Sequence, residues 1–249
     1  MVRIIISGIA GRVGKRVGIL ASEKKDYEIT GGLEFKDNPV VGKDIGEVLG
    51  IGNLGKKVQH DLSKTGTAGD VLIEFTAPDV TIAHLEEAAG KKMPVVIGTT
   101  ALSDQQVEKI HKISKDIPIV FSPNMSIGAN LLFKITEQVA RILGKSYEAE
   151  IVEAHHDKKK DAPSGTAKRL GEAVFNGNGK IPPIHSIRLS DIVGDHTVIF
   201  AGNGERIELT HRAHSRDAFA KGALDAAKFL TTKKSGLYRM QDVIQSNQK

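Results

Sequence analysis

The chain begins with Val2-Arg3-Ile4-Ile5-Ile6-Ser7, and Gly8-Ile9-Ala10-Gly11-Arg12-Val13-Gly14 follows directly. The first stretch has the Ile and Val density of a strand buried on both faces, as in a parallel sheet covered by helices. The second stretch places three glycines before a helical pattern, where the backbone can approach a pyrophosphate that the helix N-terminus attracts. This order predicts a dinucleotide-binding α/β domain. Because the spacing is G-x-x-G-x-x-G and not G-x-G-x-x-G, a plain tight turn is the alternative.

Four more β-rich runs follow within the first 121 residues, at 28–33, 70–75, 94–97 and 117–121. Helical patterns separate them. Pro78 suits the first turn of a helix, and Ser103 with Gln106 makes a capping box. Alternation of this kind predicts a doubly wound parallel sheet, a Rossmann-type domain.

Small and polar residues stand at the expected carboxyl ends of these strands, where ligands collect in an open parallel sheet. These ends are Gly8, Glu34, 76–78, 98–100 and 122–125. Glu34 comes 20 residues after Gly14, where an acidic side chain can accept hydrogen bonds from ribose hydroxyls. Strand-to-helix turns favour the same residue types for local reasons, so residues 98–100 fit either interpretation.

The pattern changes near residue 122 and predicts a second, α+β unit with a mixed sheet. A helical pattern covers 127–143, and an apolar run covers 148–154. Two further runs flank Asn203-Gly204, a strong signal for a two-residue hairpin. The last apolar-periodic stretch, 219–230, reads as a helix that could pack on either unit.

The segment from Glu153 to Thr166 is the richest in chemistry, reading EAHHDKKKDAPSGT. His155 and Lys159 are candidate proton donors, because a carboxylate-rich site can tune the pKa of either group. A helix starting near Ser164 would offer an anion its N-terminal N–H groups. A solvated lysine loop and a simple Ser cap are the alternatives. Adjacent histidines on extended chain point to opposite sides, so we expect no metal site.

Composition narrows the possible partners and compartments. The chain has 249 residues, no cysteine, and a formal charge of +5, which excludes disulfide scaffolds and thiol catalysis and favours an anionic partner. Aromatic residues at 4% are too few for base stacking, so we expect a small anion and no nucleic acid. We expect no membrane span and a cytoplasmic location.

The remaining histidines carry less weight. His211 and His214 would line a domain interface or reach the site. The others are isolated among loop or helix patterns and are expected to be structural or solvated: His60, His84, His111, His185 and His196.

Taken together, these motifs resemble the dihydrodipicolinate reductase (4-hydroxy-tetrahydrodipicolinate reductase) family almost from end to end. The family's E-A-H-H-x-x-K-x-D-A-P-S-G-T-A matches the chain from Glu153 to Ala167. The glycine turn, Gly98-Thr99-Thr100, Asn124-Met125-Ser126-Ile127-Gly128 and Gly236-Leu237-Tyr238 occur in family order.

The resemblance implies a dinucleotide-binding domain of residues 1–126 and 217–249, and a substrate-binding and oligomerisation domain of residues 127–216. It implies a homotetramer that reduces a cyclic dicarboxylate with NADH or NADPH in lysine and diaminopimelate biosynthesis. It implies that His155 and Lys159 are catalytic and that His156, Gly165 and Thr166 bind substrate. The implied cofactor-binding residues are Gly8, Ile9, Ala10, Gly11, Arg12, Val13, Glu34, Gly98, Thr99, Thr100, Ser122, Pro123, Asn124 and Met125.

Phe35 and Lys36 depart from the family, since many members place an arginine directly after the ribose-binding acid. This departure argues for use of NADH at least equal to that of NADPH. A dehydrogenase acting on another anionic molecule, or a non-catalytic NAD(P)-sensing regulator, is the alternative function.

Overall fold

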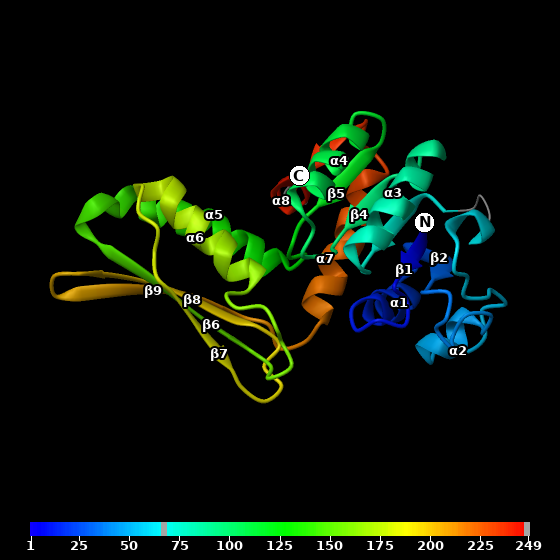
Figure 1. Ribbon diagram of the computed structural model, residues 1–249, viewed down its shortest axis with the longest axis horizontal. Helices are drawn as coiled ribbons and strands as arrows, with labels where there is room; N and C mark the ends of the chain where they lie inside the picture. Colours follow the sequence, from blue (N-terminus) through cyan, green and yellow to red (C-terminus); the bar gives the residue numbers. More distant parts are fainter. Residues whose placement is uncertain (66–68, 247–249) are drawn as a thin grey trace. The chain divides into compact units, whose positions relative to one another are not determined.

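The computed structural model describes residues 1–65 and 69–246 and divides into two compact units (Figure 1). Unit 1 comprises Met1–Met125 together with the chain from Phe219 onward, and unit 2 comprises Ser126–Ala218. The family resemblance implies divisions after residues 126 and 216. Within the described ranges no helix is both long enough and apolar enough to cross a bilayer.

Unit 1 is built on a six-stranded sheet with the order β10-β5-β4-β3-β1-β2, and every neighbouring pair is parallel. The predicted doubly wound parallel sheet is therefore confirmed. The strand order reverses between β1 and β3, which is where such sheets bind ligands. The strands are β1 (Val2–Ser7), β2 (Tyr27–Leu33), β3 (Val71–Glu74), β4 (Val95–Ile97), β5 (Pro118–Phe121) and β10 (Gly236–Tyr238).

Helices cover both faces of this sheet. Successive strand residues point to opposite sides, so one strand contributes apolar side chains to two cores. Ile4 packs in one core and Ile5 in the other, and both are fully buried. The first core contains α1 (Gly14–Ser22), the short α2 (Ile45–Leu49), α7 (Asp217–Leu230) and α8 (Met240–Ser246). The second contains α3 (Pro78–Gly90) and α4 (Asp104–Ile113), and a 3-10 turn (Leu62–Thr65) joins it. The capping box predicted at Ser103 is present at the start of α4.

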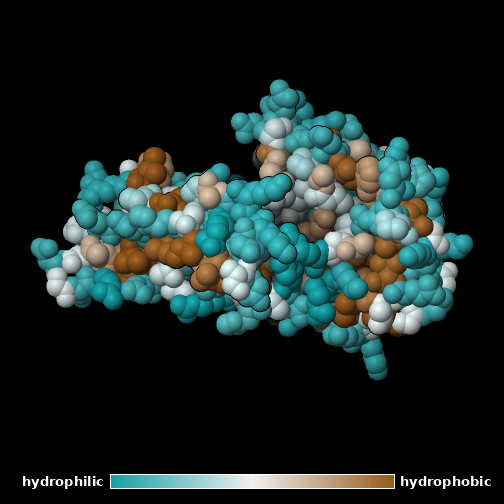
Figure 2. All heavy atoms as spheres, turned by 60° about the horizontal axis from the view of Figure 1, so that its bottom comes forward, coloured by the Kyte–Doolittle hydropathy of each residue, from teal (hydrophilic) through white to brown (hydrophobic). Residues whose placement is uncertain are grey.

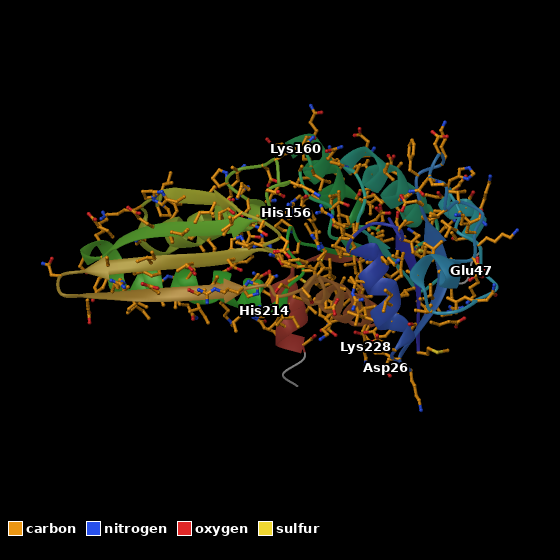
Figure 3. All side chains as sticks on the ribbon, turned by 90° about the horizontal axis from the view of Figure 1, so that it is seen from below. Asp26, Glu47, His156, Lys160, His214 and Lys228 are labelled. Carbon is orange, nitrogen blue, oxygen red and sulfur yellow. The ribbon has the colours of Figure 1, made fainter. Side chains whose placement is uncertain are left out.

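The C-terminal segment belongs to unit 1, a placement that the sequence leaves open. β10 adds a sixth strand beside β5, and α7 enters the first core with Ala223 and Ala227 fully buried. A Cβ at Gly222 would lie 1.8 Å from the carbonyl oxygen of Met125, so only glycine allows α7 to come this close. An exposed ion pair between Asp26 and Lys228 adds a minor surface contact (Figure 3).

Unit 2 is a four-stranded sheet with helices on one face (Figure 1). β6 pairs in parallel with β7, and β8 pairs antiparallel with β6 and β9, so the predicted mixed sheet and hairpin are confirmed. β7 was not predicted, because most of its residues are exposed and show no apolar alternation. The strands are β6 (Glu148–His155), β7 (Ile184–Arg188), β8 (Asp195–Gly202) and β9 (Glu205–Arg212), and the helices are α5 (Ile127–Leu143), a 3-10 turn (Gly144–Ser146) and α6 (Gly165–Asn178).

Candidate active site

Unit 1 contains a cavity of about 570 Å³ at the carboxyl ends of β1, β2 and β3, next to the point where the strand order reverses. Gly8, Gly11 and Glu34 lie in its wall, and Phe75 and Thr76 close it from the end of β3. A cavity at this place is where a doubly wound sheet binds a nucleotide. The residues expected to meet a pyrophosphate and a ribose therefore share one cavity.

The glycine turn is packed so tightly that each glycine is required. Gly8 has a φ of +75°, and a Cβ there would lie 2.3 Å from the carbonyl oxygen of Phe75. A Cβ at Gly14 would lie 2.1 Å from the Gly8 oxygen, and one at Gly11 would lie 2.9 Å from it. Ile9 is fully buried in the core and anchors the turn. The turn thus brings bare backbone and the start of α1 to the cavity, which fits a dinucleotide phosphate.

Arg12 and Val13 complete the turn before α1. Val13 is the N-cap residue of α1 and makes no side-chain cap there, while Arg12 is exposed. The N-cap position of α1 therefore carries no side-chain cap.

Glu34 links the end of β2 to the glycine turn. Its Oε2 accepts a hydrogen bond from the Ala10 N–H at 3.0 Å, and its Oε1 accepts one from the Phe35 N–H at 3.1 Å. Phe35 and Lys36 also line the cavity and are exposed. The carboxylate is therefore held in the cavity wall beside the glycine turn.

The two other segments predicted to bind cofactor follow β4 and β5, on the same edge of the sheet but outside the cavity wall. A Cβ at Gly98 would lie 2.2 Å from the Phe75 ring, which is a packing reason for that glycine. Thr99 is buried, and its hydroxyl bonds to the Thr81 hydroxyl at 2.7 Å and accepts from the Thr76 N–H at 3.2 Å. Thr100 is exposed.

After β5, the Ser122 hydroxyl donates to the carbonyl oxygen of Asn124 at 2.7 Å and fixes a turn. Pro123 is exposed, whereas Met125 is buried in the first core. Pro123 is therefore the exposed residue of this turn at the sheet edge.

His84 corrects the expectation that it is isolated. It lies on α3 in the cavity wall, and its Nδ1 is 2.7 Å from Oε1 of the fully buried Glu74 and 3.2 Å from the Ser7 hydroxyl. Burial lowers the pKa of His84, but the hydrogen bond and charge of Glu74 outweigh burial and raise it above its usual value. The sequence carries no local signal for this pair, since ten residues separate the two side chains.

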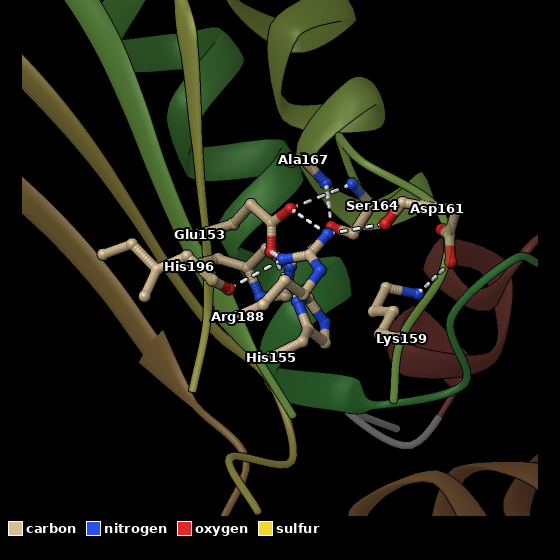
Figure 4. Close-up of polar contacts among 9 residues, drawn as sticks. Glu153, His155, Lys159, Asp161, Ser164, Ala167, Arg188 and His196 are labelled. Carbon is tan, nitrogen blue, oxygen red and sulfur yellow. Dashed lines mark hydrogen bonds and ion pairs between the residues drawn. The ribbon is translucent and has the colours of Figure 1, made fainter. Parts of the chain in front are cut away.

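In unit 2, His155 is held by Glu153 (Figure 4). The two residues are two positions apart on β6 and so face the same side of the sheet. The Nδ1 of His155 lies 2.5 Å from Oε2 of Glu153. Glu153 is fully buried, while the His155 side chain is 11% exposed. His155 therefore keeps a small opening through which a ligand can reach its ring.

Arg188 on β7 and the start of α6 complete the surroundings of Glu153. Nη1 and Nη2 of Arg188 each donate to a different Glu153 oxygen at 2.9 Å, and the Ser164 N–H donates to Oε1 at 3.2 Å. Burial raises the pKa of Glu153, but hydrogen bonds from Arg188, Ser186 and His155 dominate and lower it to about 2. Glu153 is therefore an ionised carboxylate at neutral pH. Neither Glu153 nor Arg188 was predicted as a site residue. The two-residue spacing between Glu153 and His155 is the signal that could have identified Glu153.

Burial of the ring lowers the pKa of His155. The hydrogen bond and charge of Glu153 oppose this effect, while the positive charges of Lys159 and Arg188 add to it, so the pKa lies below its usual value. His196 on β8 lies edge-on to His155 with 5.0 Å between ring centroids, and its Nε2 is 3.1 Å from the Ser164 hydroxyl. Burial, followed by the nearby His155, lowers the pKa of His196 to about 3. The expectation that His196 is isolated in a loop or helix is therefore wrong.

His185 and His211 also have polar partners. His185 lies on β7 with its Nε2 2.9 Å from Glu150, and both side chains are 56% exposed. His211 lies near the end of β9, with its Nε2 3.2 Å from the Ser126 hydroxyl at the start of α5. Both side chains of that contact belong to unit 2.

Lys159 is held within the loop that follows β6. Its N–H donates to the His156 carbonyl oxygen at 3.1 Å, and its Nζ donates to the Asp161 carboxylate at 2.8 Å. The Lys159 side chain is 22% exposed, and its neighbours Lys158 and Lys160 are exposed. Of the three lysines, only Lys159 therefore has an ordered ammonium group next to the Glu153 cluster (Figure 4).

The predicted helix start at Ser164 is confirmed. The Ser164 hydroxyl accepts from the Ala167 N–H and caps α6, which begins at Gly165. Thr166 is buried, whereas Gly165 is exposed and a Cβ there would meet no described atom within 4 Å. Open space therefore adjoins the first turn of α6, where the helix dipole favours an anion.

The comparisons with known proteins agree with this arrangement. A family model for the N-terminus of dihydrodipicolinate reductase matches residues 2–125, and one for its C-terminus matches residues 128–244. The chain belongs to the dihydrodipicolinate reductase family. It is 44% identical to the 4-hydroxy-tetrahydrodipicolinate reductases of Syntrophus aciditrophicus (strain SB), over 98% of both chains, and of Geotalea uraniireducens (strain Rf4), over 98% of this chain and 99% of the relative.

A solved member of the dihydrodipicolinate reductase family has the same fold. The dipicolinate-bound dihydrodipicolinate reductase from Paenisporosarcina sp. TG-14 superposes with a TM-score of 0.78 over 96% of this chain and 97% of its own, at 23% identity. Its likeness therefore supports the architecture. The family resemblance inferred from the sequence motifs is confirmed.

Proposed function

We propose that the protein reduces 4-hydroxy-tetrahydrodipicolinate to tetrahydrodipicolinate with NADH or NADPH, in lysine and diaminopimelate biosynthesis. The observation that carries this proposal is in unit 2. There, one buried carboxylate, Glu153, bonds both to a histidine and to the N–H that precedes the open first turn of α6. A proton-transfer group and an anion site are thus built into one cluster, which suits a substrate with two carboxylates.

The cavity of unit 1 supports dinucleotide binding. The glycine turn and the N-terminus of α1 would hold the pyrophosphate, and Glu34 would hold the adenosine ribose. When bound, the reduced dinucleotide supplies the hydride. Phe35 carries no charge and Lys36 is exposed and flexible, so we propose that NADH is used at least as well as NADPH.

Glu34→Ala is expected to weaken NADH binding about tenfold, the effect of losing about 1.4 kcal/mol. The lost contacts are the ribose hydrogen bonds and the link to the Ala10 N–H. NADPH binding should fall less, because removing a carboxylate relieves its repulsion of the 2′-phosphate. Fluorescence titration with each dinucleotide measures both constants.

Glu47→Ala is the matched control, since Glu47 is an exposed carboxylate on α2 that lies outside the wall of this cavity. It should leave both affinities unchanged within about twofold. Equal losses for NADH and NADPH in Glu34→Ala would show that Glu34 does not read the ribose.

Residues of unit 2 would bind the substrate and move the proton. The first turn of α6, at Gly165 and Thr166, would receive one carboxylate, and the lysine loop would neutralise charge around it. Lys159 would deliver a proton from Nζ to the ring carbanion that hydride addition leaves. The lowered pKa of His155 makes it mainly neutral at pH 7, so its Nε2 would accept a hydrogen bond or proton from the substrate.

Gly165→Val is expected to raise KM and the inhibition constant of dipicolinate about tenfold, because the isopropyl group would fill the open space over the first turn of α6. NADH affinity should stay within about twofold, because the glycine turn lies in unit 1. Competition assays and NADH titration give these values. A parallel loss of NADH binding would point instead to misfolding.

The direct test of the proposed function is the loss of nicotinamide absorbance with purified protein and freshly made substrate. Turnover that dipicolinate inhibits competitively is the expected result. NADH binding with no turnover of this substrate would favour a dehydrogenase for another anion. DNA retention at physiological salt with no turnover would favour the NAD(P)-sensing regulator.

We also propose that the outer face of the second sheet forms a homotetramer. α5 and α6 cover only one face. On the other face lie Val152 of β6, Ile187 of β7 and Ile199 of β8, because Ile187 pairs with Ala154 and Ile199 with Glu150, two residues on either side of Val152. Figure 2 turns the underside of Figure 1 forward and shows groups of apolar side chains among polar ones. Sedimentation should give four chains, and Ile199→Lys should lower that number.

The same proposal places the enzyme in the cytoplasm. The chain has no cysteine, so it has no disulfide that would need an oxidising compartment.

A further inference from the structure

The buried ion pair between Glu153 and Arg188 does more than join two strands. Arg188 Nη1 and Nη2 also donate to the carbonyl oxygens of Ile187, at 2.7 Å, and Asp161, at 2.5 Å. Asp161 lies near the end of the loop that carries Lys159, and His155 lies at its beginning. Glu153 therefore binds the beginning of this loop at His155, and Arg188 binds its end at Asp161 (Figure 4).

The hydrogen bonds to Glu153 also determine which ring nitrogen of His155 carries a proton. An ionised carboxylate can only accept hydrogen bonds, and Arg188 and Ser164 donate to it as well. The contact with His155 Nδ1 therefore requires the proton to lie on Nδ1. In the neutral ring, Nε2 then carries the lone pair.

We propose that Glu153, held by Arg188, is the positioning residue of this site: it keeps His155 in the tautomer that offers the Nε2 lone pair to the substrate. This inference rests on the proposed function for its catalytic consequence, although the tautomer itself does not. Groups from the neighbouring elements fit the same orientation. His196 on β8 packs edge-on against the ring, and a Cβ at Gly194 would lie 3.1 Å from Nε2, so glycine leaves room there.

A simple stabilising role would not need this arrangement. Hydrophobic residues often replace a buried ion pair at little cost in stability. Here, besides Ser186 on β7, the donors that meet Glu153 belong to parts of the site: the histidine, the residue that caps α6, and the arginine that binds the loop. Loss of a carboxylate that sets the tautomer of a catalytic histidine strongly lowers kcat.

Glu153→Gln tests the inference because an amide presents one acceptor and one donor where the carboxylate presents two acceptors. Either amide orientation places an NH₂ group against a donor of Arg188. At the Oε1 position the NH₂ group would face two fixed donors, Arg188 Nη2 and the Ser164 N–H, so the Oε2 position is favoured. With NH₂ there, Nδ1 of His155 becomes an acceptor and the ring proton moves to Nε2. Glu150→Gln is the matched control, since Glu150 is on the same strand and contacts an exposed histidine, His185.

The measurement is a long-range ¹H–¹⁵N spectrum of the full chain labelled at histidine nitrogen, at pH 8, with His155→Asn used to assign the signal. We expect a protonated Nδ1 and a bare Nε2 in the wild type and in Glu150→Gln. In Glu153→Gln we expect the opposite tautomer or a mixture, and kcat lower by about 10²-fold with NADH affinity unchanged. Glu153→Asp, which keeps the charge, should restore the wild-type tautomer and part of kcat.

A wild-type spectrum with the proton on Nε2 overturns the inference, whether or not any variant folds. So does a Glu153→Gln spectrum identical to that of the wild type. A wild type that shows the expected tautomer but does not reduce the substrate contradicts the proposed function and leaves the tautomer assignment standing. Retained kcat in Glu153→Gln with a changed tautomer would refute the catalytic consequence.

Discussion

Lys159→Met is expected to lower kcat by about 10²- to 10⁴-fold, the range for loss of a positioned acid, and to raise KM as well. The ammonium group of Lys159 is held by Asp161 at 2.8 Å beside the Glu153 cluster, so methionine removes both a proton donor and a charge that attracts a carboxylate. His155→Ala should lower kcat by a similar or smaller factor. Steady-state rates at saturating NADH, over a range of substrate concentrations, separate the two effects.

Lys158→Met and Lys160→Met are the controls for this result. Both side chains share the loop and its charge but are exposed, and the family motif assigns neither position. Each should change kcat/KM by a small factor that shrinks as salt is added, because exposed charges are screened. If either variant loses as much activity as Lys159→Met, the loop attracts anions diffusely and no single lysine is the acid.

Gly14→Ala is expected to weaken NADH binding by about 10- to 10²-fold, since about 1–3 kcal/mol of strain enters the turn that contacts the pyrophosphate. The new Cβ would lie 2.1 Å from the Gly8 carbonyl oxygen, a backbone atom that cannot rotate away. Either α1 or the turn must therefore shift. NADH titration and thermal unfolding of the same preparation separate the loss of binding from the loss of stability.

Gly90→Ala is a matched control, because Gly90 is also helical, in α3, and a Cβ there would meet no described atom within 4 Å. It should leave NADH affinity unchanged and raise stability by up to about 1 kcal/mol, since alanine loses less entropy in a helix. Wild-type NADH affinity in Gly14→Ala would show that the glycine turn does not hold the dinucleotide.

Local patterns were sufficient for most of unit 1. Its buried strands are dense in Ile and Val, and glycine, proline and capping residues mark their ends, so β1 and α4 begin where the sequence predicts. Two strands escaped prediction for a physical reason. β7 has an exposed pattern, and β10 has three residues, so neither has an apolar period to detect.

The residues of the candidate site also fall into those that local sequence predicts and those that it does not. His155, Lys159 and the α6 start lie within one segment, and their residue types alone indicated proton transfer and anion binding. His84 and His196 were misjudged because their partners, Glu74 and the His155 ring, come from other elements.

The sequence by itself determined most of the strands and helices and the glycine turn, because those choices depend on neighbours a few residues apart. Only the tertiary structure decided that β7 lies beside β6, and this pairing brings Arg188 to Glu153 across 35 residues of chain. It also decided that α7 and β10 complete unit 1. Burial then removes water from Glu153, so that its charge is balanced by Arg188 and directed hydrogen bonds, and these orient His155.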